Sequence, residues 1–146
     1  MPTHDDLASW QAIHDLITAG AQAQDRHDWD FYGNTFSPNA RYVHPKGEIR
    51  GREAIVARSV AALEPLDASQ HLVGSIVVHV DADRAHATSY FVGQHVRAAA
   101  PGDSLFVVAG TYDDELARVN GIWQITQRTQ TYSWRQGNPD VIVRSS

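Results

Sequence analysis

A carboxylate at the end of an apolar helical stripe is the feature of this sequence that points most directly to chemistry. Asp25 follows Ala21 by four residues and so continues a stripe with three- and four-residue steps, formed by Trp10, Ile13, Ile17 and Ala21. An ionised side chain facing a core is costly unless something pairs with it. His71 opens a later apolar run and is a candidate partner. A buried Asp25–His71 pair predicts proton-transfer chemistry, but an Asp that caps a helix or binds a loop amide fits the same spacing.

The two side chains would have distinct roles if they meet. The carboxylate of Asp25 would accept a hydrogen bond from one ring nitrogen of His71, fix the tautomer and stabilise the imidazolium that forms. The other nitrogen would take a proton from a substrate carbon, and a positioned base of this kind typically contributes ~10²–10⁴ in rate. The alternative is a buried structural pair without a catalytic role.

Arg128 is the third candidate catalytic residue, and its surroundings depend on the register of a hairpin predicted at Asn120-Gly121. A two-residue turn places Asp113 opposite Arg128, which makes a cross-strand ion pair. A three-residue turn with a bulge places Tyr112 there and turns Arg128 toward an aromatic-lined face. There it would stabilise a leaving group or a developing oxyanion. The residues alone leave both registers open.

Further side chains are predicted to contact a substrate, and they are Tyr42, Phe91, His95, Tyr112 and Tyr132. Tyr42 shares a strand face with His44 and either donates a proton to a carbonyl or departing hydroxyl, or forms an aromatic wall. His95 shares a strand face with Phe91 and is either a second acid–base group or a solvated strand residue.

Composition excludes several classes of function. The net charge of −5 and the pI near 5.8 argue against nucleic acid as a partner. The chain has no Cys, and its eight His include no His-Glu-x-x-His motif, so we expect no metal site. No Gly-x-Gly-x-x-Gly or Walker loop is present, so we expect no cofactor. The polar N-terminus and the lack of a long apolar run predict a cytoplasmic protein without membrane contact.

The order of predicted elements indicates an α+β fold in a single domain of residues 1–146. Helices are expected from about Thr3 or Asp5 to Gln24, over 29–36 and over 52–63. Strands are expected over 40–44, 71–80, 85–97, 105–119 and 122–134. This pattern predicts a cone-shaped, curved antiparallel sheet with about three helices on its concave face, enclosing an apolar pocket. The open face of the sheet needs cover, so we expect a homo-oligomer, dimer or trimer.

Several local motifs in this order resemble the SnoaL-like branch of the nuclear transport factor two-like superfamily. The segments that carry the resemblance are 23–29, 36–40, 51–55, 71–74, 89–91, 110–116 and 120–123, with Arg128. In cofactor-free lyases of this family, an Asp near the end of the first long helix orients a His at the start of a strand. The resemblance therefore implies that Asp25 and His71 form this dyad, that Arg128 is an active-site residue and that Tyr42 lines the pocket. Dehydrochlorinating and some dehydrating relatives carry a functional side chain five residues before the Asp, where this chain has Gly20. This difference argues against dehydrochlorination of the substrate that those dehydrochlorinating relatives use.

The sequence thus favours a cofactor-independent lyase that carries out a dehydratase-type elimination on a small hydrophobic, cyclic substrate. His71 would be the general base, Asp25 would orient it, and Arg128 or Tyr42 would stabilise the leaving group. The alternatives are an isomerase or polyketide-type cyclase with the same base, or a non-catalytic subunit that binds a small ligand or scaffolds a partner.

Overall fold

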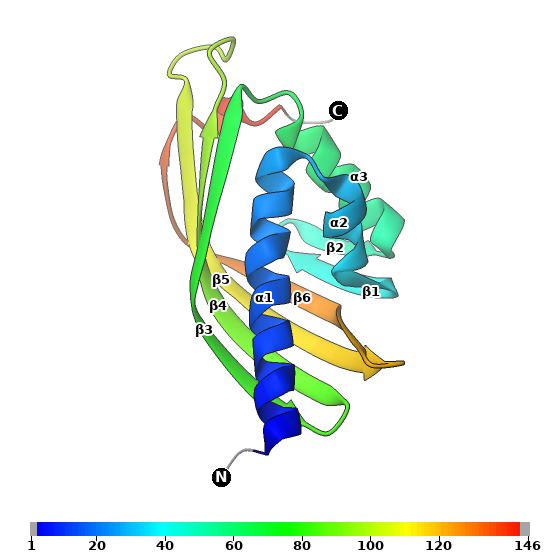
Figure 1. Cartoon of the computed structure of the whole chain (residues 1–146). Coiled ribbons are helices and arrows are strands. Elements are labelled where there is room, and N and C mark those ends of the chain that lie inside the picture. Colours follow the sequence, from blue (N-terminus) through cyan, green and yellow to red (C-terminus); the bar gives the residue numbers. More distant parts are fainter. Residues whose placement is uncertain (1–2, 144–146) are drawn as a thin grey trace.

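Three helices pack against one curved, unclosed sheet of six strands (Figure 1). The computed structural model describes residues 3–143. The helices are α1 (His4–Arg26), α2 (Trp29–Asn34) and α3 (Arg52–Leu63). The strands are β1 (Phe36–His44), β2 (Gly47–Arg50), β3 (Ala68–Asp81), β4 (Arg84–Val96), β5 (Leu105–Val119) and β6 (Ile122–Gly137), followed by a short 3₁₀ turn, Pro139–Val141. The predicted α+β class is confirmed.

The first helix fixes the position of Asp25 relative to the sheet. It begins at a capping box, in which Thr3 accepts from the Asp6 backbone N–H and Asp6 accepts from that of Thr3. It ends at His27, whose left-handed backbone (φ 57°) stops the helix directly after Asp25 and Arg26. Its buried face includes Ile13, Ile17 and Ala21, as the stripe predicted. Trp10, which was expected in the core, is instead 38% exposed and stacks on His14.

The strands follow the order β2-β1-β6-β5-β4-β3. Every neighbouring pair is antiparallel except β1 and β6, which are parallel, so the wholly antiparallel sheet that was predicted is wrong at this one pair. Strand β1 occupies the edge of the meander that β3–β6 form, and β2, which was not predicted, folds back on it. Because β6 runs from β5 back beside β1, residues Tyr42 and Arg128 become direct neighbours.

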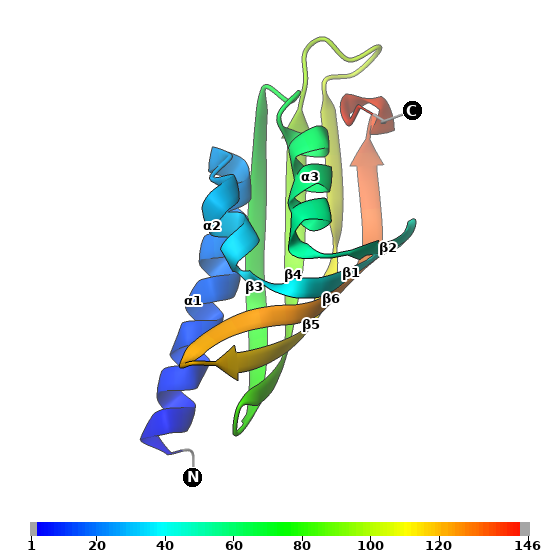
Figure 2. The same cartoon turned by 90° about the vertical axis from the view of Figure 1, so that its right-hand side faces the viewer.

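The helices cover one face of the sheet, and α3 lines a cleft on that face. Helix α1 runs along β3, whereas α3 stands over the middle strands β4 and β5 (Figure 2). The core accordingly divides into two clusters. One gathers Ile13 and Ile17 of α1 with Phe36 and Leu116, and the other lies between α3 and the middle strands. No helix within residues 3–143 has both the length and the apolar character needed to cross a membrane. The outer face of the sheet exposes Leu72, Tyr90 and Trp134, and the expected homo-oligomer stays a prediction.

The β5–β6 hairpin has a register that neither sequence alternative anticipated. Asn120 and Gly121 both have positive φ and form the expected two-residue turn between Val119 and Ile122. The pairing then shifts by one residue between Glu115 and Leu116, because β6 carries an additional residue there. As a result Asp114, rather than Asp113 or Tyr112, lies opposite Arg128.

This shift creates a buried ion pair. Arg128 donates from Nε to Asp114 Oδ1 at 2.8 Å and from Nη2 to Asp114 Oδ2 at 2.9 Å. The Asp114 side chain is fully buried, and the Arg128 guanidinium lies 4.0 Å from the centroid of the Tyr112 ring. Burial opposes the charged form of Arg128, but the adjacent carboxylate outweighs it and raises the pKa of the guanidinium. Each charge therefore depends on its partner.

We predict that Asp114→Ala strongly destabilises the protein, because it leaves the Arg128 charge buried without a partner. Breaking a buried pair in this way costs about 3–5 kcal/mol in the free energy of unfolding. Asp113→Ala is the matched control, since Asp113 is exposed and its ion pair within residues 3–143 is with His86 on the outer face, and it should cost less than about 1 kcal/mol. Urea unfolding of the two variants measures both values, and equal costs would contradict the buried pair.

Candidate active site

A cleft opens between α3 and the concave face of the sheet. It holds about 590 Å³ of free space, including its open mouth. Its lining carries many more polar groups than the apolar pocket that was predicted, including three His, three Tyr, one Arg and two Gln. The lining residues are Gln24, Tyr42, His44, Arg58, Ser59, Ala62, Leu63, His71, Phe91, Gly93, His95, Val108, Tyr112, Gln130, Tyr132 and Ile142.

Asp25 and His71 meet at one side of this cleft. His71 Nδ1 lies 2.7 Å from Asp25 Oδ1, and the His71 backbone N–H donates to Asp25 Oδ2 at 2.8 Å. Ser69 Oγ also donates to Oδ1, at 3.0 Å. Ser69 and His71 share a face of β3 because they are two residues apart on a strand. The C-terminal end of α1 and the first residues of β3 are thereby joined through one carboxylate.

The hydrogen bonds keep Asp25 ionised. Burial alone would raise its pKa, but the His71 ring, the His71 backbone N–H and Ser69 together outweigh burial and lower the pKa below the ordinary value of 3.8. An ionised carboxylate can only accept hydrogen bonds. The shared hydrogen must therefore sit on His71 Nδ1, and in the neutral ring Nε2 keeps its lone pair.

Nε2 of His71 lies beside Gly93, and both residues line the cleft. A Cβ built on Gly93, which is directly opposite His71 on β4, would lie 3.3 Å from His71 Nε2 and 3.2 Å from Cδ2. The same Cβ would lie 3.3 Å from Cε1 of His95. Glycine at this position therefore leaves the space that both imidazoles occupy.

His95 is a second imidazole of fixed tautomer. Its ring packs edge to face on His71 with centroids 5.6 Å apart, and its Nδ1 lies 3.0 Å from the carbonyl oxygen of Phe106. A carbonyl only accepts, so Nδ1 carries the hydrogen and Nε2 keeps a lone pair. Burial lowers the pKa of His95 to about 4, with the neighbouring His71 contributing in the same direction.

Three tyrosines form much of the remaining wall. The hydroxyl of Tyr42 donates to Gln130 Oε1 at 2.5 Å, and burial raises the pKa of Tyr42 well above its usual value. Tyr112 stacks on Phe91 with ring centroids 4.5 Å apart. Tyr132 Oη lies 2.8 Å from His44 Nε2 on the side of the cleft formed by β6 and β1. All five predicted substrate-contacting residues therefore line the cleft.

Two of the three predicted catalytic residues lie outside the lining. Asp25 reaches the cleft only through His71, as a residue that orients a base would. Arg128 faces the interior as one of the two registers implied, and lies over Tyr112, but two of its nitrogens donate to Asp114. Gly20 is also not among the lining residues, and a Cβ added there would meet the Thr35 side chain at 3.4 Å.

Sequence reasoning missed several polar residues around the cleft. Ser69 could have been found from strand periodicity, because it is two residues before His71 and must share its face. Arg58 and Ala62 are four residues apart on α3 and so lie on one helix face, but nothing in the sequence says that this face meets the cleft. No sequence pattern marked Gln130 or Gln24 as residues of the cleft.

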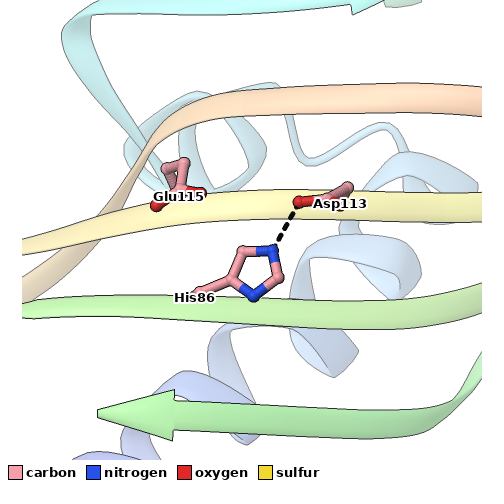
Figure 3. A group of neighbouring side chains, drawn as sticks. All are labelled: His86, Asp113 and Glu115. Carbon is pink, nitrogen blue, oxygen red and sulfur yellow. Dashed lines mark hydrogen bonds and ion pairs between the residues drawn. The ribbon is translucent and has the colours of Figure 1, made fainter. Parts of the chain in front are cut away.

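A separate polar group lies on the outer face of the sheet. Figure 3 shows His86 of β4 beside Asp113 and Glu115 of β5, with His86 Nε2 2.6 Å from Asp113 Oδ1. One potential ligand atom from each residue lies within 4.8 Å of the others, which is a spacing that could hold a metal ion. These side chains are exposed or partly exposed and lie on the opposite face from the cleft, so they do not contribute to its chemistry.

The fold agrees with what comparison with known proteins shows. The family model of the SnoaL-like domain matches residues 5–129, and the chain belongs to this family. Among curated proteins, no significant match is found.

Solved structures share the architecture at low identity. Hexachlorocyclohexane dehydrochlorinase LinA-type3 from Novosphingobium barchaimii is 18% identical, with a TM-score of 0.78 over 97% of this chain and 98% of that one. A protein assigned as a scytalone dehydratase from Novosphingobium aromaticivorans is 18% identical, with a TM-score of 0.79 over 96% and 92%. The Kfla4162 protein from Kribbella flavida is 20% identical, with a TM-score of 0.80 over 86% and 91%. Such identities show the common fold alone, a nuclear transport factor two-like fold.

We predict that His44 and His95 stay neutral far into the acid range. Burial lowers the pKa of each to about 4, from an ordinary value of 6.5. Because the unfolded chain binds these protons first, the stability that they contribute is complete above about pH 6.5 and is lost as the pH falls toward 4. A nuclear magnetic resonance titration of the ring resonances measures both values, and a midpoint near 6.5 for either ring would show that it is not buried as described.

Proposed function

We propose that this protein is a cofactor-independent lyase that catalyses a dehydratase-type elimination on a small, hydrophobic cyclic substrate. His71 is the general base, and Asp25 holds its ring and stabilises the charge that the ring acquires. The observation that carries the proposal is the 2.7 Å contact between His71 Nδ1 and Asp25 Oδ1, which leaves the second nitrogen bare beside the cleft. Membership of the SnoaL-like family supports a small-molecule enzyme at the level of the family.

The other predicted residues receive roles that follow from their contacts. Tyr42 donates its hydroxyl hydrogen to Gln130, which favours the aromatic-wall role over that of proton donor. Arg128 lies over Tyr112 and is held by Asp114, so we propose that it supports the tyrosine wall from behind. Phe91 and Tyr112 offer a stacked apolar surface for a flat ring.

We expect His71→Ala to reduce turnover by about 10²–10⁴-fold, the usual contribution of a positioned general base. Asp25→Asn should reduce it as well, because the amide no longer selects the Nδ1–H tautomer or stabilises the imidazolium. His79→Ala is the matched control, since His79 is an exposed histidine of the same strand. The assay is a panel of hydroxylated and halogenated cyclic compounds, followed by mass spectrometry of the products. Full turnover by His71→Ala would end the proposal.

The same assay separates elimination from isomerisation. An elimination product is lighter than its substrate by the mass of the group that leaves, whereas an isomerase or cyclase with the same base can give a product of unchanged mass. A product of unchanged mass whose formation still requires His71 would show that His71 is the base of an isomerase or cyclase and not of a lyase.

We expect Gly93→Ala to impair turnover while leaving the fold intact. The added methyl group would lie 3.2–3.3 Å from the rings of His71 and His95, so both must shift by a few tenths of an ångström. A displacement of about 1 Å at a reacting group can cost about 10²-fold, so a smaller shift should give a loss of several-fold. Gly74→Ala on β3 is the control, because its added methyl meets no atom within 4 Å. Both variants are measured with a substrate identified from the compound panel. Equal activity of the two would show that the rings are not confined at Gly93.

A further inference from the structure

The side of the cleft formed by His44 and Tyr132 is arranged to donate hydrogen bonds. His44 Nδ1 accepts from the backbone N–H of Lys46 at 3.2 Å, so this nitrogen cannot carry a hydrogen. A neutral ring must then be protonated at Nε2, which lies 2.8 Å from Tyr132 Oη. His44 therefore donates to Tyr132 rather than accepting from it.

The orientation of this hydrogen bond determines what Tyr132 can do. Its oxygen accepts from His44, so its own hydrogen must point elsewhere. Tyr132 lines the cleft, and within residues 3–143 its hydroxyl has no other protein partner. The free O–H is thus available to a bound molecule. Tyr42 differs in this respect, because its hydrogen already goes to Gln130.

Arg58 adds a positive charge to the same side of the cleft. It lies on α3 among the lining residues, with its guanidinium carbon 5.9 Å from the centroid of the Tyr42 ring. Arg41, Arg118 and Arg128 each pair with a carboxylate, whereas Arg58 forms no ion pair within residues 3–143. Burial lowers the pKa of His44, and the charge of Arg58 is the next cause in the same direction. Burial raises the pKa of Tyr132, and the charge of Arg58 is the next cause, which opposes that rise. Arg58 therefore lies near both groups.

We propose that Tyr132 and Arg58 form an oxyanion site that binds a substrate oxygen bearing full or developing negative charge. His44 is a positioning residue, which directs the Tyr132 hydrogen into the cleft. The inference deepens the proposed function and rests on it, since it specifies that the substrate presents such an oxygen while His71 takes its proton.

The proposed reaction balances with these groups alone. His71 Nε2 takes a proton from the carbon next to a carbonyl, and the C–H electron pair forms a C=C bond as the carbonyl π pair moves onto oxygen. Tyr132 and Arg58 stabilise the resulting enolate. The enolate then re-forms the carbonyl and expels a hydroxyl from the next carbon, which leaves as water with the proton that His71 returns.

The oxyanion site is tested by binding rather than by turnover. The probe is 4-nitrophenol, whose anion absorbs visible light, and 4-nitroanisole is the control ligand because it has no ionisable oxygen. The wild-type protein should bind the phenolate more tightly than the phenol and so lower the pKa of the bound probe. Tyr132→Phe should weaken phenolate binding about tenfold, the effect of a lost hydrogen bond to a charged group.

Arg58→Gln should weaken phenolate binding by about fivefold and reduce its dependence on salt. Arg84→Gln makes the same change in charge at an exposed residue remote from the cleft, where β4 begins, and should have no effect. Nitroanisole affinity should be unchanged in all three variants. Wild-type phenolate affinity in both Tyr132→Phe and Arg58→Gln, or an equal loss for nitroanisole, would overturn the proposal.

The positioning role of His44 is tested by a double-mutant cycle. His44→Phe should weaken phenolate binding about threefold, and His44→Gln should restore it, because the Gln amide can donate from a similar place. In the Tyr132→Phe background, His44→Phe should have no further effect on binding. An equal loss in both backgrounds, or no loss in either, would refute the role of His44.

Failure of this inference is distinguishable from failure of the proposed function. The preference for nitrophenolate over nitroanisole should persist in His71→Ala, because the base is not part of the oxyanion site. If turnover survives in His71→Ala, His71 is not the general base. The binding data still show whether Tyr132 and Arg58 form the oxyanion site.

Discussion

The single carboxylate of Asp25 determines how the rest of the cleft is organised. Three donors converge on it: the His71 ring, the His71 backbone N–H and the Ser69 hydroxyl. A partly buried charge requires such partners, and the same bonds join the end of α1 to the first part of β3. The interactions that make the charge tolerable in the fold thus also select the tautomer of His71. Stability and the proposed catalysis depend on the same contacts, so the dyad cannot be altered without affecting both.

Backbone groups set the character of the two sides of the cleft. The Phe106 carbonyl accepts from His95 and leaves a lone pair on Nε2 of that ring, as Asp25 does for His71. The Lys46 N–H has the opposite effect on His44 and makes Nε2 a donor. Because backbone groups are fixed as donors or acceptors, they assign the tautomers without help from solvent. The cleft lining thus includes both rings that carry a bare nitrogen and a ring that donates from Nε2.

Local patterns predicted the elements and the dyad, whereas the pairings that depend on long-range packing were not predictable. The step from Ala21 to Asp25 and the position of His71 at the start of an apolar run were enough to suggest their contact, and Asn120-Gly121 gave the hairpin. The bulge that moves Asp114 opposite Arg128 has no signature of its own, because the pairing changes by one residue within regular strands. The parallel contact of β1 with β6 and the approach of α3 to the cleft likewise depend on the packing of the whole chain. Arg58 was missed for that reason, whereas the contact of Lys46 with His44 is local, between residues two apart at the turn after β1.

The most direct test of the account is a neutron crystal structure at alkaline pH, where an ordinary imidazole is neutral. Deuterium should be visible on His71 Nδ1, directed at Asp25 Oδ1, and Nε2 should be bare toward Gly93. Deuterium on Nε2 with Nδ1 bare, or a His71 ring turned away from Asp25, would contradict the central claim that this carboxylate prepares His71 as a base.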